Sequence, residues 1–385
     1  MLLLRLILKN TFRHRLRAVL TMAGVAIALT AFGLMRTVLD AWNAGVSASS
    51  ANRLVTRNAV SLTQPLPYAY KGRIRQVTGV SIVAAGNWFG GIYLDEKNFF
   101  ANFAVEAEDF FKLYPELVVG PAEQKAFTMD RKAAIIGRKL AERFHWRLGD
   151  TVTLRGTIFP GQWPLTIRAI YKGARPDTDE TVLYMHWAYI DEVMKKTSPR
   201  RAGQTGFFMI GIDDATRAAE ISKAIDGLFV NSQAETLTET EKAFQMGFVS
   251  MSEAILAAIT AVSYVVIGII LAVAANTMAM SARERLGEFA VMKTLGFAGP
   301  SLALMLLAES LLLSLSGAAL AMAALPVIAD AFATHLAQYF PIFLVSRQTM
   351  ILIPAFGALV GLLAAVAPAA RVGSVRIAEA FRRIG

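Results

Sequence analysis

The chain has 385 residues, of which 55% are hydrophobic, with a formal charge of +10 and a mean hydropathy of +0.46. This composition is too apolar for a soluble domain alone and too charged for a bare helix bundle, so we expect membrane and aqueous parts together. Residues 40–250 carry 25 Lys and Arg against 23 Asp and Glu, so the excess positive charge lies mostly beside the apolar segments and does not indicate nucleic-acid binding.

Residues 1–17 are predicted to be a cytoplasmic amphipathic segment, in which residues 1–11 alternate apolar residues with Arg and Lys. Residues 1–11 are predicted to form an amphipathic helix on the inner membrane surface, and the alternative is a plain basic flank. Residues 18–39 are the first predicted span. Their apolar run is longer than that of a cleaved secretory signal, so we expect an uncleaved anchor.

Residues 40–250 change character, with turns, alternating strands and short amphipathic helices that predict an aqueous α+β domain. The predicted strands are residues 54–62, 80–88, 101–105, 133–136, 151–154, 165–171, 181–184, 207–212 and 234–236. The predicted helices are residues 68–77, 108–114, 138–144, 187–196 and 214–229, the last capped by Asp213 or Asp214.

An aromatic-rich stretch, residues 88–103, has two readings. It is either a hairpin that contributes aromatic side chains to a core, or a surface for an amphipathic cargo or a periplasmic partner.

No catalytic, metal-binding or nucleotide-binding pattern occurs in the sequence. The histidines lie far apart, at positions without metal-ligand spacing, and neither HExxH nor GxSxG is present. The GxxxxGK[ST] loop that would hold nucleotide phosphates is also missing, and there is no cysteine for disulfides, thiol nucleophiles or thiolate metal sites. We therefore expect no catalytic, cofactor or metal site on this chain.

The second predicted span is residues 251–280, within which residues 254–275 carry no charge. Those 22 residues extend about 33 Å as a helix, which matches the roughly 30 Å hydrocarbon core of a bilayer. Because residues 238–280 contain no proline, one continuous helix over 239–280 is expected. The alternative is that Gly247 separates an aqueous stalk from the span.

The loop that follows, residues 281–300, is rich in charge. Apolar residues recur at three- and four-residue steps, which predicts a short amphipathic helix. Gly296 can end that helix in a left-handed cap, and Pro300 suits the first turn of the next helix. For an arbitrary membrane protein, such a helix is also compatible with a solvated connector.

The third and fourth spans are predicted at residues 301–329 and 349–370, joined by a short loop, residues 330–348. Glu309 lies inside the third span, where an unpaired carboxylate is costly. It is expected to face the bundle interior and bind a neighbouring helix; a proton or substrate relay is the alternative. Gly357 and Gly361 form a GxxxG pattern for close helix packing, either within one subunit or at a dimer face.

Lys and Arg in the short flanking segments set the orientation. They precede the first span, lie in residues 281–300 and fill the tail, residues 371–385, whereas residues 330–348 contain only Arg347. Both termini and residues 281–300 are therefore predicted to be cytoplasmic, and residues 40–250 and 330–348 to lie on the other side.

Three stretches resemble a known family. Residues 284–296, ERLGEFAVMKTLG, followed by Ala308-Glu309-Ser310, resemble the FtsX-like permease domain of MacB/LolC-type ABC transporters. Residues 105–117 and 133–154 are similar to the periplasmic core domain that MacB-type permeases insert after their first span.

The resemblance implies a bacterial inner-membrane protein with four transmembrane α-helices and a large α+β extracytoplasmic domain, residues 40–250, between spans one and two. In that family, the loop at this place is the coupling helix that docks on an ATPase. The implied coupling residues are Arg283, Glu284, Arg285, Glu288, Lys293 and Gly296.

The implied function is that of a non-catalytic permease subunit, which transmits ATP-driven motion to the periplasmic side for export or extraction of substrate. ATP is then used by a separate ATPase chain, and a second permease subunit and membrane lipid are the other expected partners. The sequence leaves open whether the pair is homo- or heteromeric and whether a periplasmic adaptor joins it. The alternative function is an FtsX-like regulator of periplasmic cell-wall enzymes, although FtsX-type ectodomains are generally smaller.

Overall fold

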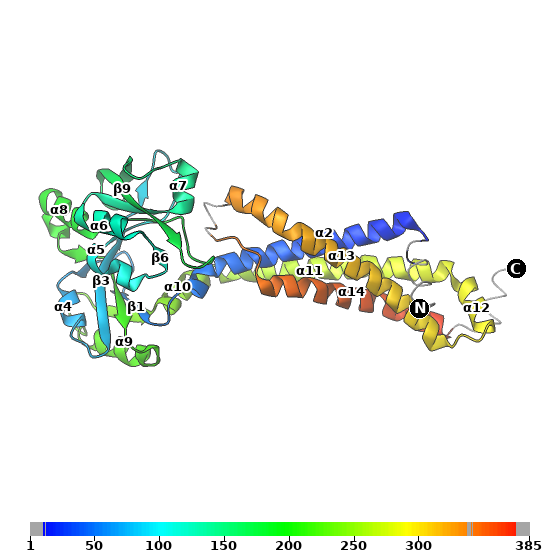
Figure 1. Ribbon diagram of the computed structural model, residues 1–385. Coiled ribbons are helices and arrows are strands. Elements are labelled where there is room, and N and C mark those ends of the chain that lie inside the picture. Colours follow the sequence, from blue (N-terminus) through cyan, green and yellow to red (C-terminus); the bar gives the residue numbers. More distant parts are fainter. Residues whose placement is uncertain (1–10, 12, 337–339, 341, 375–385) are drawn as a thin grey trace. The chain divides into compact units, whose positions relative to one another are not determined.

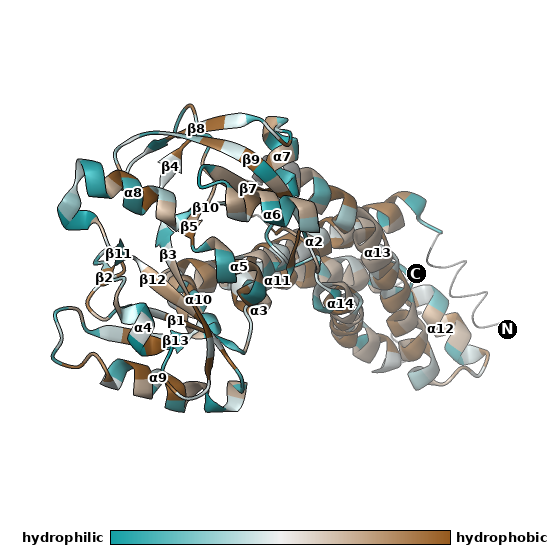
Figure 2. Cartoon of the chain, turned by 60° about the vertical axis from the view of Figure 1, so that its left-hand side comes forward, coloured by the Kyte–Doolittle hydropathy of each residue, from teal (hydrophilic) through white to brown (hydrophobic). Residues whose placement is uncertain are grey.

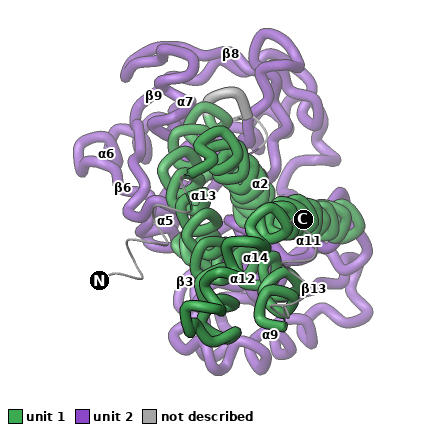
Figure 3. The backbone as a smooth tube through the Cα atoms, turned by 90° about the vertical axis from the view of Figure 1, so that its right-hand side faces the viewer, with its two compact units in different colours: residues 1–41, 252–335, 343–385 green, residues 42–251, 336–342 purple. Residues whose placement is uncertain are grey.

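A computed structural model describes residues 11, 13–336, 340 and 342–374 (Figure 1). The chain divides into two compact units (Figure 3). The helical unit comprises residues 1–41, 252–335 and 343–385, and the sheet unit comprises residues 42–251 and 336–342. The amphipathic helix predicted at the N-terminus falls on residues that lie almost entirely outside the described ones, as does most of the predicted tail.

Four long helices form the helical unit, and hydrophobic residues dominate all of them (Figure 2). They are α2 (Arg15–Trp42), α11 (Glu253–Glu284), α13 (Gly299–Leu336) and α14 (Arg347–Ser374), with the short α12 (Leu286–Thr294) between α11 and α13. Each of the four is long and apolar enough to cross a membrane, which confirms the predicted four-span fold class. The helix α13 continues to Leu336, past the end predicted for the third span, so the following loop is shorter than predicted.

Small residues bring the helices of this unit close together. A Cβ added to Gly317 on α13 would lie 2.8 Å from the carbonyl oxygen of Met22 on α2. On α14, a Cβ on Gly357 would lie 2.8 Å from the Cβ of Ala318, and one on Gly361 would come similarly close to α13. The GxxxG pattern therefore packs α14 against α13 of the same chain.

The prediction of one continuous helix over residues 239–280 is wrong. The structure has two helices, α10 (Glu241–Ser250) and α11, and a turn at Met251 and Ser252 separates them. Gly247, the residue considered as the break, lies inside α10. The preference for a turn over a continued helix at Met251 and Ser252 has no evident cause in the residue types, since neither is glycine or proline.

The sheet unit is built around an 11-stranded sheet with strand order β13-β1-β12-β3-β5-β10-β7-β9-β8-β4, in which β6 also pairs with β9. These strands are β1 (Arg53–Asn58), β3 (Val80–Trp88), β4 (Gly91–Ile92), β5 (Asn102–Val105), β6 (Leu117–Val118), β7 (Ala133–Gly137), β8 (Thr151–Gly156), β9 (Gly161–Gly173), β10 (Leu183–His186), β12 (Phe207–Ile212) and β13 (Thr236–Thr240). The pairs β5–β10 and β7–β9 are parallel, and the other ladders of this sheet are antiparallel. A separate ladder joins β2 (Leu66–Pro67) to β11 (Gln204–Thr205).

Helices cover both faces of the large sheet. The helices of this unit are α3 (Ala44–Ala48), α4 (Tyr70–Ile74), α5 (Ala107–Leu113), α6 (Pro121–Met129), α7 (Arg138–Phe144), α8 (Trp187–Thr197), α9 (Ala218–Gly227) and α10, with the 3₁₀ turns η1 (Pro199–Arg201) and η2 (Ala215–Arg217). Along β7, Ala134 and Ile136 join one core with α7 and α8, whereas Ala133 and Ile135 join another with α5 and α6. Successive strand residues point to opposite faces, so a strand buried on both sides is apolar throughout.

Most predicted strands and helices of this unit are present, with shifted ends. The strands at 80–88 and 207–212 and the helix at 138–144 have the predicted bounds. The helix predicted at 214–229 divides into η2 and α9, and Asp214 caps η2 by accepting a hydrogen bond of 2.8 Å from the amide of Thr216. In the aromatic stretch, Phe89 and Phe100 are buried in the core, whereas Trp88 and Phe99 are exposed. A role of this stretch as a surface for a cargo or partner stays a prediction.

Gly137 ends β7 where another segment crosses it, and a Cβ there would overlap the backbone of Glu180. We expect Gly137→Ala to destabilise the sheet unit by about 1–3 kcal/mol or more, because backbone atoms cannot move aside as a flexible side chain can. The measurement is the thermal unfolding midpoint of the full chain, together with limited proteolysis. Gly227→Ala is the matched control, since nothing lies within 4 Å of that position. Equal midpoints for the two variants would contradict the prediction.

Candidate functional site

The helix α12 starts abruptly after α11. Arg285 has φ −105° and ψ 12°, which is not helical, so the chain changes direction there before Leu286 begins α12. The carbonyl of Arg285 still accepts a hydrogen bond of 3.0 Å from the amide of Phe289. Arg285 is therefore the junction between the second span and the short helix.

The other end of α12 is a Schellman motif. The amide of Gly296 donates to the carbonyl of Lys293 at 3.1 Å, and the amide of Phe297 donates to the carbonyl of Met292 at 3.0 Å. Gly296 has φ +93°, a left-handed conformation that favours glycine. This turn leads directly into α13, with Pro300 in the first turn as predicted.

A buried ion pair joins the α11–α12 junction to α13. Arg285 and Glu309 are only 6% and 4% exposed, and Nη1 of Arg285 donates to Oε2 of Glu309 at 2.7 Å. The guanidinium also lies 5.0 Å from the ring centre of Phe289. Either charge alone would be costly in this position, so each residue compensates the other.

Two further ion pairs connect this region to the start of α2. Arg17 donates two hydrogen bonds, of 2.7 and 2.8 Å, to the carboxylate of Glu284, and Arg13 pairs with Glu288. Partial burial opposes ionisation of Glu288, but Arg13 and Arg285 outweigh it and lower the pKa of that carboxyl. These exposed pairs are weaker than the buried one.

The remaining side of α12 packs against α13 and α14. Nζ of Lys293 donates to the carbonyl of Gly373 at 2.8 Å, and a Cβ on Gly299 would overlap that same carbonyl. An apolar cluster fills the space between these helices, comprising Ala282, Phe289, Leu302, Met305, Leu306, Ala369 and Val372. The short helix is thus fastened to three of the four long helices.

The opposite face of α12 and its terminal turn are exposed and apolar. Val291, Leu295 and Phe297 are 48%, 74% and 37% exposed. Thr294 and Gly296, between them in sequence, are exposed as well. Large apolar side chains gathered on one exposed face are typical of a surface that binds another protein.

The structure separates the six residues predicted for coupling into two groups. Arg283 and Gly296 are exposed, whereas Glu284, Arg285, Glu288 and Lys293 bind other parts of the helical unit. Docking through the charged side chains stays a prediction. The exposed apolar residues were missed, although the sequence Leu-Gly-Phe at the end of the helix was a signal, since the glycine turn exposes its neighbours.

Glu309 and the histidines also have defined places. Glu309 is buried and faces the bundle interior, as expected, but its partner Arg285 lies at the turn between α11 and α12 and not within a neighbouring helix. His186 is buried, its Nε2 lies 2.7 Å from the carbonyl oxygen of Phe127, and burial lowers its pKa. Within the described part of the chain, no three His, Cys, Asp or Glu side chains gather in a group suited to a metal ion.

Comparisons with known proteins give the family. A family model described as the MacB-like periplasmic core domain matches residues 18–228, and one described as the FtsX-like permease C-terminal matches residues 260–376. The chain belongs to the MacB/FtsX-type permeases. Such permeases are non-catalytic subunits of ABC transporters and multi-pass bacterial membrane proteins, and the family implies a cytoplasmic ATPase partner.

Solved structures similar to this MacB/FtsX-type permease cover about half of it. One is the extracellular domain of the noncanonic ABC-type transporter YknZ from Gram-positive bacteria, with 14% identity, 49% of this chain and 100% of that chain covered, and a TM-score of 0.37. Another is a domain of a permease protein from Porphyromonas gingivalis, with 10% identity, 50% and 92% coverage, and a TM-score of 0.34. A search of the curated proteins found no match.

The mutual compensation of Arg285 and Glu309 in this permease can be tested with single and double variants. Arg285→Leu removes the cation beside the buried carboxylate of Glu309 and should destabilise the purified protein by about 3–5 kcal/mol, whereas the double variant Arg285→Leu/Glu309→Leu should recover most of the loss. Unfolding midpoints in detergent measure both. Arg283→Leu, at an exposed neighbouring position, is the matched control and should change stability by less than about 0.5 kcal/mol. A double variant no more stable than Arg285→Leu would contradict a compensated pair.

Proposed function

We propose that this permease transmits ATP-driven motion from a cytoplasmic ATPase on a separate chain to the periplasmic side, where that motion exports or extracts substrate. One observation carries the proposal: α12 has an exposed apolar face on one side and is fastened to three long helices on the other. The match of residues 18–228 to a MacB-like periplasmic core domain supports the periplasmic output.

The contacts of α12 make it suited to passing on a displacement. Glu288 pairs with Arg13, just before α2 begins. The pair Arg285–Glu309 and the bond from Lys293 tie α12 to α13 and α14, and the apolar cluster ties Phe289 to Ala282 of α11. A displacement of the exposed face of α12 would therefore move all three long helices while their contacts with α12 stay intact. Large apolar and aromatic side chains at the centre of an interface usually supply most of its binding energy.

The other partners follow from the surface of the helical unit. The helix α11 exposes Val262, Val265 and Ile269, which are 47%, 58% and 59% exposed. Apolar side chains on the outside of a membrane bundle face lipid or another subunit. The proposed assembly has two permease subunits in lipid with their ATPases, and ATP is used by the ATPases alone.

If α12 docks on the ATPase, one negative charge on its exposed apolar face should weaken that docking. Leu295→Asp should reduce copurification of the coexpressed cognate ATPase at least tenfold, because a carboxylate would be buried in an apolar contact at a cost of at least about 1.4 kcal/mol. Transport should fall in parallel. The unfolding midpoint should stay unchanged, since Leu295 is exposed.

Leu148→Asp is the matched control, because Leu148 is an exposed leucine of the sheet unit. It should leave ATPase binding intact. Full ATPase copurification with Leu295→Asp would remove α12 as the docking surface, and equal losses in both variants would point to a general solubility effect.

The proposed orientation, with both termini and α12 in the cytoplasm, can be tested because the chain has no cysteine. Lys172→Cys is exposed on β9 and should react with a membrane-impermeant maleimide in intact, outer-membrane-permeabilised cells. Thr294→Cys, exposed on α12, should react only after the inner membrane is broken. The reverse labelling pattern would invert the topology.

A further inference from the structure

The sheet unit contains a cavity of about 340 Å³ under one face of its large sheet. Strand residues of alternate positions line it, namely Val55 on β1, Phe103 on β5, Tyr184 on β10 and Met209 on β12. The strands form two neighbouring pairs, β1–β12 and β5–β10, with β3 between them, and because alternate residues project to the same side, the four side chains lie on one face of the sheet. Phe244 on α10 lines it as well.

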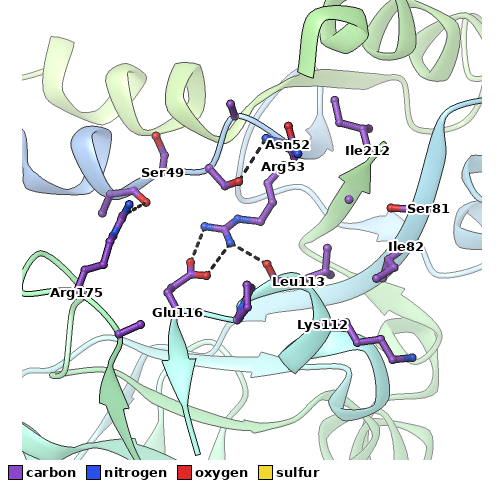
Figure 4. Close-up of a pocket in the computed structure, with 16 residues that line it drawn as sticks. Ser49, Asn52, Arg53, Ser81, Ile82, Lys112, Leu113, Glu116, Arg175 and Ile212 are labelled. Carbon is purple, nitrogen blue, oxygen red and sulfur yellow. Dashed lines mark hydrogen bonds and ion pairs between the residues drawn. The ribbon is translucent and has the colours of Figure 1, made fainter. Parts of the chain in front are cut away.

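Arg53 forms a fixed polar edge of this cavity. Its side chain donates to Glu116 Oε1 and to the carbonyl of Leu113, each at 2.7 Å (Figure 4). It also donates to Glu241 Oε2 at 2.9 Å, and its guanidinium lies 4.2 Å from the ring centre of Tyr114. Burial lowers the pKa of Arg53, but the two carboxylates outweigh this effect and raise it. Arg53 is thus engaged by two carboxylates and a carbonyl of the chain itself, so it is not the group that would bind a ligand charge.

A second, polar basin of about 720 Å³ adjoins the apolar cavity and is shown in Figure 4. The two share Ala48, Ser49, Arg53, Glu116 and Arg175 as lining residues. Arg175 is 54% exposed, pairs with Asp177 at 3.1 Å and donates to the carbonyl of Ala48 at 3.2 Å. An exposed pair of this kind is weak, so Arg175 remains available to an anion at the border between the apolar and polar spaces.

One buried polar group of the cavity wall points to a ligand as well. Thr178 is only 7% exposed, and its hydroxyl has no hydrogen-bond partner among the described residues. Buried hydroxyls are nearly always paired, so an unpaired one in a cavity wall calls for a missing partner. The neighbouring Asp179 also lines the cavity, and burial raises the pKa of its carboxyl.

We propose that this cavity binds a single-chain amphiphile with an anionic head, its apolar chain against Phe103, Tyr184 and Phe244 and its head beside Arg175 and the Thr178 hydroxyl. The cavity has the size and make-up of known small-molecule sites, which are mostly apolar with a few convergent polar groups. The site lies wholly within the sheet unit and does not depend on how α12 acts.

The test uses the full chain in nanodiscs, with one cysteine introduced at Ala101→Cys, which lines the cavity. Reaction of that cysteine with a small maleimide should slow about tenfold when free dodecanoate is about ten times its dissociation constant, and acetate should have no effect. Ala219→Cys, exposed on α9, is the matched control and should react at an unchanged rate. Slowing at both cysteines, or at neither, would overturn the site.

The proposed contact between the anionic head and Arg175 is tested by comparing two variants. In the Ala101→Cys chain, Arg175→Gln should raise the dodecanoate concentration for half-protection about tenfold, since a direct charge-assisted contact of about 1.4 kcal/mol is lost. Lys172→Gln, a nearby exposed cation outside the cavity, should not change that concentration. If dodecyltrimethylammonium protects the cysteine as well as dodecanoate does, the anionic head is wrong.

Discussion

The buried pair of Arg285 and Glu309 is the contact on which the arrangement of the helical unit depends. A buried ion pair adds little net stability, but an unmatched member of it is strongly destabilising. The chain must therefore place Arg285 where Glu309 can reach it, and that requirement fixes where α11 ends and where α12 starts. The glycine turn at Gly296 and the weaker pairs with α2 then set the direction of α12.

The sheet unit also contains a buried arginine that is paired with carboxylates. Arg53 is buried at the start of β1, where it binds Glu241 of α10 and two groups at and just after the end of α5. As with Arg285, a cation beside carboxylate partners joins segments that are far apart in the sequence. In each unit, one arginine thus fixes a position where backbone hydrogen bonding alone would allow several arrangements.

Patterns of apolar residues were sufficient to predict the membrane helices and the principal strands. The charge-free run at 254–275 and the alternation along 207–212 are local, so they can be read without knowing the partners. The two-residue strands form through pairing with distant segments, so the sequence carries no local signal for them. The helix α6 was missed although Pro121 in its first turn is a start signal, and the turn at Met251 and Ser252 has no cause in its residue types. In the candidate site, the position of Glu309 was predictable, but its partner was not, because Arg285 also fits a solvated, mixed-charge loop.

The close glycine contacts of the bundle have a mechanical consequence. Gly317, Gly357 and Gly361 bring the backbones of α2, α13 and α14 into direct contact, and sliding one helix along another would place side chains where no space exists. These three helices can then tilt together but hardly shear. Any such tilt displaces the surrounding acyl chains, so the stiffness and thickness of the bilayer become part of the load against which the protein works.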